Sequence, residues 1–252
     1  MLVHTEHRYR TPNSDPRFLV TVRLRGILTE SFRYYASRMT GAVNVRTRPV
    51  TGEHIIAAEC PTRECLFEYY AMLLQENIQT VFILCDPAEF ISGRQLDYYS
   101  VDFSEYKHGG WLQVTGRETG RQPLSGLQVH YYTMYLNMNQ GALNHTVNVV
   151  KLAGWQDCRG ITCEQLSDWV DLVRYYINGP FVVHCSAGRG RTGVTLAALH
   201  LRENPNSRPE TVCSLMSQNR GVGMPQTPVQ KELLKAYARD LRRRARGRCT
   251  VM

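Results

Sequence analysis

The sequence predicts a single α/β domain in which buried strands alternate with amphipathic helices around one core. Residues 80–85 (TVFILC) and 181–184 (FVVH) contain no acidic residue, lysine or arginine, which indicates strands buried on both faces. Residues 63–78 and the segment after Thr162 place apolar side chains near every 3.6 positions, the spacing of a helix with one buried face. A chain of 252 residues is within the range of one large domain.

The first predicted helix follows Thr62, a residue type that caps helix N-termini. Its apolar face consists of Leu66, Tyr69, Tyr70, Leu73 and Leu74. The strand at 80–85 follows directly, so this part of the chain predicts a helix that leads into the centre of the sheet.

The middle of the chain predicts strands and turns. Residues 92–128 are glycine-rich and alternate in polarity, which is typical of meandering strands. Residues 130–138 and 145–153 predict two longer strands, joined as a hairpin around residues 139–141.

Helices dominate the last part of the chain. Thr162 and Gln165 have the spacing of a capping box, and Gly179-Pro180 ends the helix that they open. The buried face of this helix is predicted to contain Leu166, Trp169, Val170, Val173, Tyr176 and Ile177. Three more helices are predicted after the strand at 181–184: residues 192–203, a helix with Pro209 in its first turn, and residues 228–244.

Composition and charge are those of a globular chain. Hydrophobic residues make up 43% and charged residues 21% of the sequence, and no run of 18 apolar residues occurs. The first ten residues lack the apolar stretch of a signal peptide, so we expect a cytosolic protein. Of the net charge of +8, residues 239–252 hold +5, from six arginines and one aspartate. The basic charge therefore belongs mainly to the C-terminal tail, and we expect no nucleic-acid-binding body.

The eight cysteines are scattered along the chain, at positions 60, 65, 85, 158, 163, 185, 213 and 249. Cys60 and Cys65, and Cys158 and Cys163, share a five-residue step, but the paired C-x-x-C spacing of a zinc knuckle is absent. We therefore expect reduced thiols and no metal site.

The segment with the strongest chemical signal is VVHCSAGRGRTGV, residues 182–194. A glycine-rich turn between a strand and a helix can direct its backbone N–H groups at a tetrahedral anion. The G-K-[ST] ending of a nucleotide-binding loop is absent, and Cys185 and Arg191 stand at the two ends of the turn instead. A buried structural cysteine is the alternative, but that interpretation leaves the glycines and Arg191 unexplained.

This pattern predicts a nucleophile for phosphoryl transfer. Backbone dipoles and a helix terminus lower a thiol pKa from ~8.5 towards ~4 to 7, and an arginine can bind two phosphate oxygens at once. Thr192 is expected to donate its hydroxyl to the sulfur, and His184 is expected to brace the loop from behind rather than to act as a base.

The residues HCSAGRGRT (184–192) match H-C-x5-R-[ST], the signature that the protein tyrosine phosphatase superfamily carries. The sequence resembles the tyrosine-specific phosphatase domain over roughly residues 9–240. Four other segments show the same resemblance: residues 55–85, GWQD at 154–157, GMPQTPVQ at 223–230 and HRYR at 7–10.

The resemblance implies a highly twisted mixed sheet flanked by helices, with the phosphate-binding loop between a strand and a helix. It implies a catalytic domain over residues 1–241 and a polybasic tail over 242–252. It further implies a protein-tyrosine phosphatase that needs no cofactor or metal, and phosphotyrosine-containing proteins as substrates.

The resemblance also assigns roles to single residues. Asp157 is implied as general acid and base, Gln226 as the residue that positions the attacking water, and Gln230 as its assistant. Trp155 is implied as the anchor of the loop that carries Asp157, and Tyr9 as the stacking partner of the substrate ring. The phosphate-binding residues implied are Ser186, Ala187, Gly188, Arg189 and Gly190.

Three further observations concern the same loops. A carboxylate partner is implied for Arg191, and Glu105 is our candidate. Gln156 stands where the family carries a proline, and one additional residue separates Arg220 from Gln226.

Two alternative functions stay open. Arg189 stands where tyrosine-specific members carry an aliphatic residue, and a base at this position is typical of phosphoinositide phosphatases. A domain that only captures phosphotyrosine is the other alternative, although Cys185, Arg191 and Asp157 are all present.

The C-terminus predicts lipidation. Cys249-Thr250-Val251-Met252 fits C-a-a-X with a preference for farnesyl, and the arginines before it supply a second membrane signal. The prediction is farnesylation of Cys249 and attachment to an anionic membrane surface; a basic nuclear or RNA-binding tail is the alternative.

Overall fold

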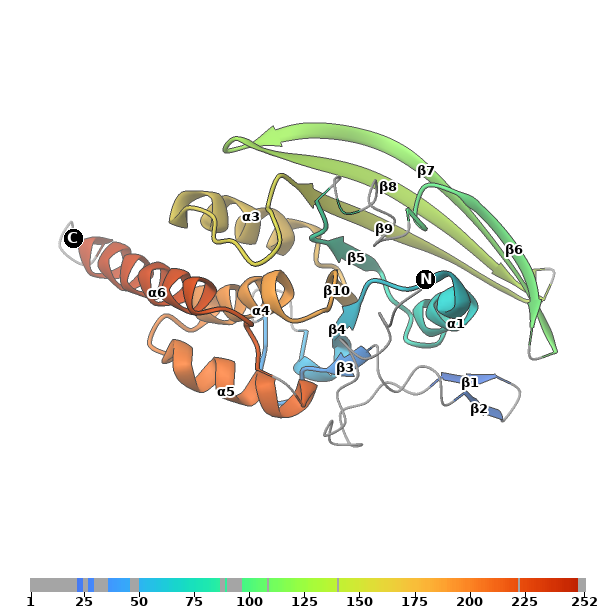
Figure 1. Ribbon diagram of the computed structural model, residues 1–252, viewed down its shortest axis with the longest axis horizontal. Coiled ribbons are helices and arrows are strands. Elements are labelled where there is room, and N and C mark those ends of the chain that lie inside the picture. The colour runs from blue at the N-terminus through green and yellow to red at the C-terminus, as the bar shows by residue number, and fades with distance from the viewer. Residues whose placement is uncertain are drawn as a thin grey trace, which may run out of the picture.

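A mixed eight-stranded sheet runs through the centre of the computed structural model, which describes residues 22–24, 27–29, 36–45, 50–86, 89, 97–107, 109–139, 141–221 and 223–248 (Figure 1). In spatial order its strands are β3 (Ala36–Arg38), β4 (Ile55–Glu59), β10 (Phe181–Cys185), β5 (Thr80–Ile83), β9 (Leu143–Ala153), β8 (Leu127–Met138), β7 (Gly110–Leu124) and β6 (Asp102–Lys107). The four strands β4, β10, β5 and β9 are parallel, and all other neighbours are antiparallel. A separate antiparallel pair is formed by β1 (Val22–Leu24) and β2 (Ile27–Thr29).

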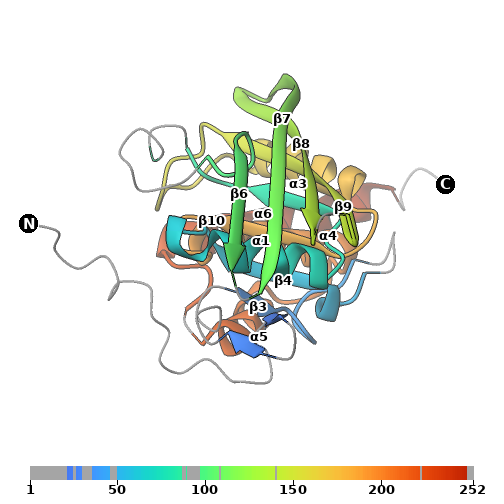
Figure 2. The same ribbon diagram turned by 90° about the vertical axis from the view of Figure 1, so that its right-hand side faces the viewer.

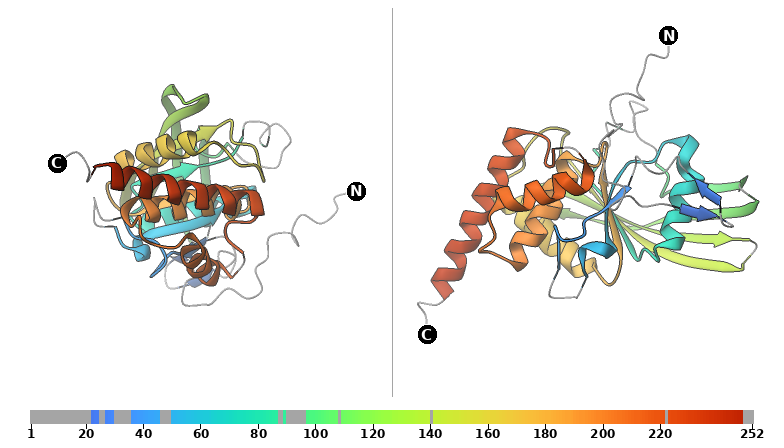
Figure 3. Two further views of the ribbon diagram at one scale, coloured as in Figure 1. Left: turned by 90° about the vertical axis from the view of Figure 1, so that its left-hand side faces the viewer. Right: turned by 90° about the horizontal axis from the view of Figure 1, so that it is seen from below.

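Helices cover both faces of the parallel part of the sheet. One face carries α1 (Leu66–Gln75), and the other carries α3 (Cys163–Tyr176), α4 (Gly190–Glu203), α5 (Pro209–Arg220) and α6 (Pro228–Arg248) (Figure 3). Short 3-10 turns lie at η4 (Gly52–His54) and η5 (Arg63–Cys65). Successive residues of a strand point to opposite faces, so Val182 packs in the cluster under α1 and Val183 in the cluster under α3 and α4. The predicted α/β domain with a mixed sheet is confirmed.

The antiparallel strands extend well beyond this two-sided core (Figure 2). In β6 exposed and half-buried residues alternate, whereas all five residues of β10 are buried. The predicted hairpin of two long strands is confirmed as β8 and β9, and the meandering segment before it contains β6 and β7.

The predicted helix boundaries are confirmed where a cap defines them. The backbone N–H of Gln165 donates to Thr162 Oγ1 at 3.1 Å, and the N–H of Thr162 donates to Gln165 Oε1 at 3.0 Å. Pro209 is the first residue of α5, as predicted. The first helix was predicted too long: it ends at Gln75 rather than 78, and Asn77 has a φ of +50° that no helix accommodates.

No helix within the described ranges combines the length and the apolar character needed to cross a membrane. The seven cysteines that the structure describes form no disulfide.

Candidate active site

The phosphate-binding loop predicted from the sequence lies at the carboxyl end of β10, in the middle of the parallel part of the sheet. It spans Ser186 to Arg189 and leads into α4 at Gly190. Gly188 has a φ of +63°, and a Cβ atom there would lie 2.1 Å from the carbonyl oxygen of Ala58. A Cβ at Gly190 would lie 2.8 Å from the Nε2 of Gln230. The loop is therefore packed on both sides: only glycine fits at Gly188, where backbone is in the way, and a side chain at Gly190 would displace the end of Gln230.

Neighbouring residues hold the loop by its carbonyl groups. The backbone N–H of Cys60 donates to the carbonyl oxygen of Ser186 at 3.0 Å, and Arg220 Nη2 donates to that of Ala187 at 3.5 Å. Arg220 is buried, and its Nη2 lies 3.6 Å from Oε1 of Glu59. Burial raises the pKa of Glu59 to about 8, and Arg220 and Arg189 oppose this rise. These contacts bind two carbonyls of the loop to the body of the protein.

His184 supports the loop from behind. Its Nδ1 lies 3.2 Å from the carbonyl oxygen of Cys185, and its Nε2 lies 2.7 Å from the hydroxyl of Tyr98. Burial lowers the pKa of His184 to about 4, so the ring is neutral at neutral pH. Because a carbonyl only accepts, Nδ1 carries the proton and Nε2 accepts from Tyr98. This geometry matches a bracing residue rather than a base.

Arg191 is completely buried and connects three parts of the site. Its Nη1 and Nη2 donate to the two carboxylate oxygens of Glu89 at 2.6 and 2.9 Å. The same two nitrogens also donate to the carbonyl oxygen of Trp155 at 3.0 Å and to Oδ1 of Asp157 at 3.1 Å. Burial lowers the pKa of Arg191, but the hydrogen bonds to Glu89 together with the nearby charges of Cys185, Cys85 and Glu89 outweigh burial and hold the pKa above its ordinary value.

The carboxylate partner of Arg191 is thus Glu89, and the choice of Glu105 was wrong. Glu105 lies on β6, opposite Leu112 of β7, and four other strands separate β6 from β10. Glu89 follows β5, the direct neighbour of β10, so the carboxyl ends of two adjacent parallel strands bring the pair together. A carboxylate shortly after the buried strand 80–85 was the sequence signal that could have identified it.

The loop that carries Asp157, residues 154–159, follows β9 and is called the acid loop below. Trp155 anchors it. The side chain of Trp155 is buried, and its indole N–H donates to the carbonyl oxygen of Arg159 at 2.9 Å. Gln156 is exposed, and Asp157 has 48% of its side chain exposed. The structure therefore brings the predicted acid next to Arg191, on a loop that lies largely in solvent.

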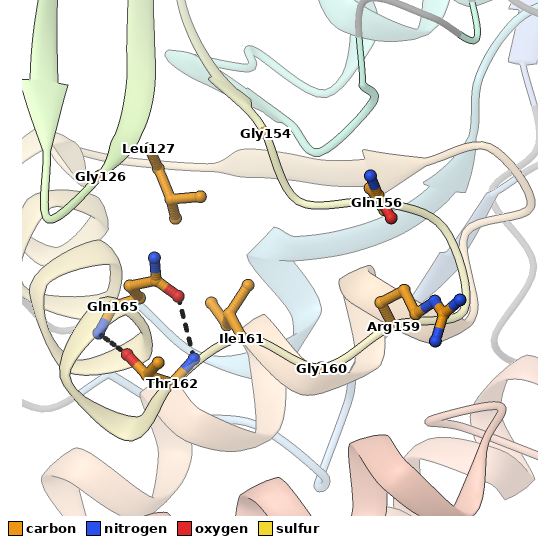
Figure 4. Close-up of a pocket in the computed structure, with 9 residues that line it drawn as sticks. All are labelled: Gly126, Leu127, Gly154, Gln156, Arg159, Gly160, Ile161, Thr162 and Gln165. Atoms are coloured by element: carbon orange, nitrogen blue, oxygen red, sulfur yellow. Dashed lines mark hydrogen bonds between the residues drawn. The ribbon is translucent and has the colours of Figure 1, made fainter.

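An open pocket of about 550 Å³ lies beside this loop (Figure 4). It is lined by the turn between β7 and β8, by the acid loop and by the first turn of α3. Its wall contains Gly126, Leu127, Gly154, Gln156, Arg159, Gly160, Ile161, Thr162 and Gln165. Cys185 and Arg191 are not among these residues, so the pocket is separate from the phosphate-binding loop.

Several buried donors around the phosphate-binding loop have no hydrogen-bond partner among the described residues. They are Nε of Arg189, Nε of Arg191, Oγ1 of Thr192 and Nε2 of Gln230. Leaving one buried polar group unsatisfied costs about 1–3 kcal/mol, so four around one loop indicate the place of a bound acceptor. This arrangement fits a tetrahedral anion above Cys185.

The remaining predicted residues divide into placed and undescribed ones. Gln230 is buried at the start of α6, and its Oε1 accepts from the N–H of Thr227 at 3.1 Å. Gln226 is exposed on the segment before this helix. Tyr9 and Cys249 lie outside the described residues. Sequence reasoning missed Glu89, Arg220 and Tyr98, which support the loop from distant parts of the chain.

A model of the protein-tyrosine phosphatase family matches residues 28–230. The chain belongs to this family, whose members are hydrolases. This phosphatase is 27% identical over 217 residues to the secreted effector protein SptP of Salmonella typhi. The match covers 79% of the chain and 38% of the effector, so the chain spans about two fifths of that relative's length.

Solved structures of PTPN18 show the same fold. Three of them, two in complex with HER2 phosphopeptides, match 89% of the phosphatase chain with TM-scores of 0.65 to 0.66. The match covers 77 to 83% of those chains at 17 to 18% identity.

Proposed function

We propose that this phosphatase hydrolyses phosphotyrosine in proteins through a phosphocysteine intermediate on Cys185. The observation that carries the proposal is the double role of Arg191, which closes the phosphate-binding loop and also binds Asp157. One residue thereby keeps the proposed proton donor next to the proposed phosphate site, where it can reach the leaving tyrosyl oxygen.

In the first step, the thiolate of Cys185 attacks phosphorus, and the bond between phosphorus and the tyrosyl oxygen breaks. Asp157 gives its proton to that oxygen, so tyrosine leaves neutral. Arg191 binds two of the non-bridging oxygens, one with its unpartnered Nε and one with the Nη2–H that Asp157 releases when it turns to the tyrosyl oxygen. Backbone N–H groups of residues 186–190 bind the phosphoryl group. The unpartnered donors of Arg189, Arg191 and Thr192 support this placement.

In the second step, water attacks the phosphocysteine, Asp157 takes a proton from that water, and the bond between phosphorus and sulfur breaks. Gln226 positions the water, with assistance from Gln230. The hydroxyl of Thr192 donates to the departing sulfur, for which its unpartnered state is the supporting observation. Tyr9 is proposed to stack on the tyrosyl ring and to favour phosphotyrosine over the shorter phosphoserine.

Three measurements on a phosphotyrosine peptide test the proposal. Cys185→Ser is expected to abolish turnover while peptide binding persists, and Asp157→Ala is expected to trap the peptide. Activity is expected to be the same with and without a chelator. A requirement for a divalent ion, or full activity after alkylation with iodoacetate, contradicts the mechanism.

A phosphoinositide phosphatase is the second candidate, favoured by Arg189. This half-buried arginine lies near the pair formed by Glu59 and Arg220, and its Nε has no partner in the part of the chain that the structure describes. A positive charge with an unpartnered N–H beside the phosphate-binding loop suits a polyanionic headgroup. The ratio of kcat/KM for inositol phosphates to that for phosphotyrosine peptide decides between the two, and Arg189→Met is expected to lower it if headgroups are substrates.

The proposed organisation is a catalytic domain over 1–241 followed by a basic tail over 242–252. Helix α6 continues through this boundary, and Arg242 donates to the carbonyl oxygens of Pro205 and Ser207, both at 2.9 Å. We propose a cytosolic enzyme whose Cys249 is farnesylated and whose exposed arginines contact anionic lipid, at about 1 kcal/mol for each arginine. Loss of membrane association in Cys249→Ser, with unchanged activity, is the expected result.

A further inference from the structure

Three groups that bind soft metal ions converge behind the phosphate-binding loop. They are the thiols of Cys60 and Cys85 and the imidazole of His184, and their ligand atoms all lie within 4.8 Å of one another. Cys60 follows β4, His184 belongs to β10 and Cys85 follows β5, so the groups come from the carboxyl ends of three adjacent parallel strands. Cys60 and Cys85 pack in the cluster under α1, whereas Cys185 belongs to the opposite cluster.

The strand order argues against a disulfide between these two thiols. Strand β10 lies between β4 and β5, so two strand spacings, about 9.5 Å, separate the backbones that carry Cys60 and Cys85. A disulfide joins Cα atoms that are less than about 7 Å apart. A metal ion does not have this limit, because bonds of about 2.3 Å to sulfur and 2.0 Å to nitrogen bridge ligands from separated strands.

We propose that Cys60, Cys85 and His184 form an inhibitory site for a thiophilic divalent ion, Zn²⁺ in the first place. Two thiols give up their protons to solvent, two metal–sulfur bonds and one metal–nitrogen bond form, and the fourth position is left for water. The site is distinct from the reaction, which uses no metal in the proposed function. Only the inhibition rests on that function; the binding does not.

Inhibition follows from the hydrogen bonds of His184. One ring nitrogen contacts the carbonyl oxygen of Cys185 and the other contacts the hydroxyl of Tyr98. An ion on either nitrogen therefore displaces one of these two partners. Binding at Nδ1 removes the hydrogen bond between the ring and the loop, and binding at Nε2 removes the hydrogen bond to Tyr98 that fixes the ring behind the loop.

Access to the site is through Cys60. Its residue keeps 8% of its surface exposed, whereas Cys85 and His184 keep none. Zn²⁺ is therefore expected to act slowly, over a time set by local opening of the protein rather than by diffusion.

The binding test uses the full chain with Cys185→Ser, so that the nucleophile cannot hold the ion. Co²⁺ is the probe, because its bonds to thiolates produce a charge-transfer band in the near ultraviolet. We expect one Co²⁺ per chain, displaced by Zn²⁺, and no band after adding Cys60→Ser or Cys85→Ser. Cys213→Ser, a change on α5 outside the cluster, is the matched control and is expected to keep the band.

Two further readouts keep the test decisive if a cysteine variant folds poorly. Zn²⁺ is expected to raise the unfolding midpoint of the Cys185→Ser parent and of the Cys213→Ser control only. On the unsubstituted chain, Zn²⁺ is expected to protect Cys60 from alkylation, as measured by mass spectrometry of its peptide.

With Cys185 intact, Cys60→Ser is expected to raise the Zn²⁺ concentration for half-inhibition by about tenfold or more relative to Cys213→Ser. Equal inhibition of both variants, absence of the Co²⁺ band, or a Cys60–Cys85 disulfide in the oxidised protein overturns the proposal. An inactive enzyme that shows the band contradicts the proposed function and leaves the metal site supported.

Discussion

The two loops that meet at Arg191 differ in how they are held. The phosphate-binding loop is packed on two sides, by Ala58 against Gly188 and by Gln230 against Gly190. The acid loop has four exposed residues in succession, from Gln156 to Arg159, and a pocket of about 550 Å³ beside it. A binding site for a phosphoryl group gains from being fixed before the substrate arrives, whereas a proton donor has to move aside for the substrate to enter. The difference in packing therefore follows the difference in proposed roles.

The largest effect is expected from breaking the link between the loops. Arg191→Lys keeps the charge but loses the planar fork that binds Glu89, Trp155 and Asp157. We expect kcat/KM on phosphotyrosine peptide to fall by about 10³-fold or more, as for other arginines that stabilise a transferring phosphoryl group. A decrease smaller than tenfold would show that the two loops act independently.

Removing the charge of Glu89 is expected to act on stability. Glu89→Gln removes the buried counter-charge of the Arg191 guanidinium and leaves it only the half-exposed Asp157, at a cost of about 3–5 kcal/mol in the free energy of unfolding. The matched control is Glu105→Gln on β6, expected to change the same free energy by less than about 0.5 kcal/mol. Urea denaturation of both variants measures the difference, and equal values would refute the assignment of Glu89.

A pair of glycine substitutions compares the loops directly. Gly188→Ala places a Cβ 2.1 Å from a backbone oxygen, at a φ of +63°, and is expected to cost about 3 kcal/mol. Gly154 is the first residue of the acid loop and has a φ of +94°. The Cβ atom that Gly154→Ala adds would lie 3.3 Å from its nearest neighbour, a side-chain carbon of Leu127. The expected cost of this change is about 1–2 kcal/mol, from the backbone alone. Equal costs, measured by urea denaturation, would show that the phosphate-binding loop is no more tightly packed than the acid loop.

The rear support of the phosphate-binding loop is sensitive to pH. His184 has a pKa of about 4 in the folded protein because it is buried, whereas an unfolded chain protonates histidine near pH 6.5. The unfolded state therefore binds more protons between these values, and stability is lost as pH falls from 6.5 to 4, by about 3 kcal/mol from this residue. Glu59, with a pKa raised to about 8 in the folded protein, acts in the opposite direction: its contribution to stability is lost as pH rises from 4.5 to 8. The His184→Asn variant removes the contribution of the histidine. If the free energy of unfolding of this variant depends on pH below 6.5 as it does in the unsubstituted chain, the prediction is contradicted.

The smallest effect is expected in the acid loop. Gln156→Pro introduces the residue that the family carries there, at an exposed position where nothing packs tightly. We expect kcat to change by no more than about tenfold and the unfolding free energy by less than about 1 kcal/mol. A larger change in stability would mean that the loop is more tightly held than its exposure indicates.

Local chemistry made much of this protein predictable from its sequence. The capping box at Thr162, Pro209 at the start of α5 and the uncharged strands 80–85 and 181–184 act within a few residues, and the structure confirms them. Residues 184–192 are contiguous, so their pattern also indicated a loop between strand and helix. The predicted end of the first helix was wrong because the apolar spacing continues to Ile78, although Asn77, a residue type that often ends helices in the left-handed conformation, was a signal for an earlier end.

Tertiary structure alone decided which distant groups meet at that loop. Arg191 meets Glu89 across 102 positions of sequence, and Arg220 reaches Ala187 across 33. The thiols of Cys60 and Cys85 meet at His184 because β10 enters the sheet between β4 and β5. The spacing of residues along the chain predicts neither the order of parallel strands nor the pairing of buried charges, since both depend on which surfaces are buried together. The sequence alone therefore determined the reacting loop, and the strand order determined what supports it.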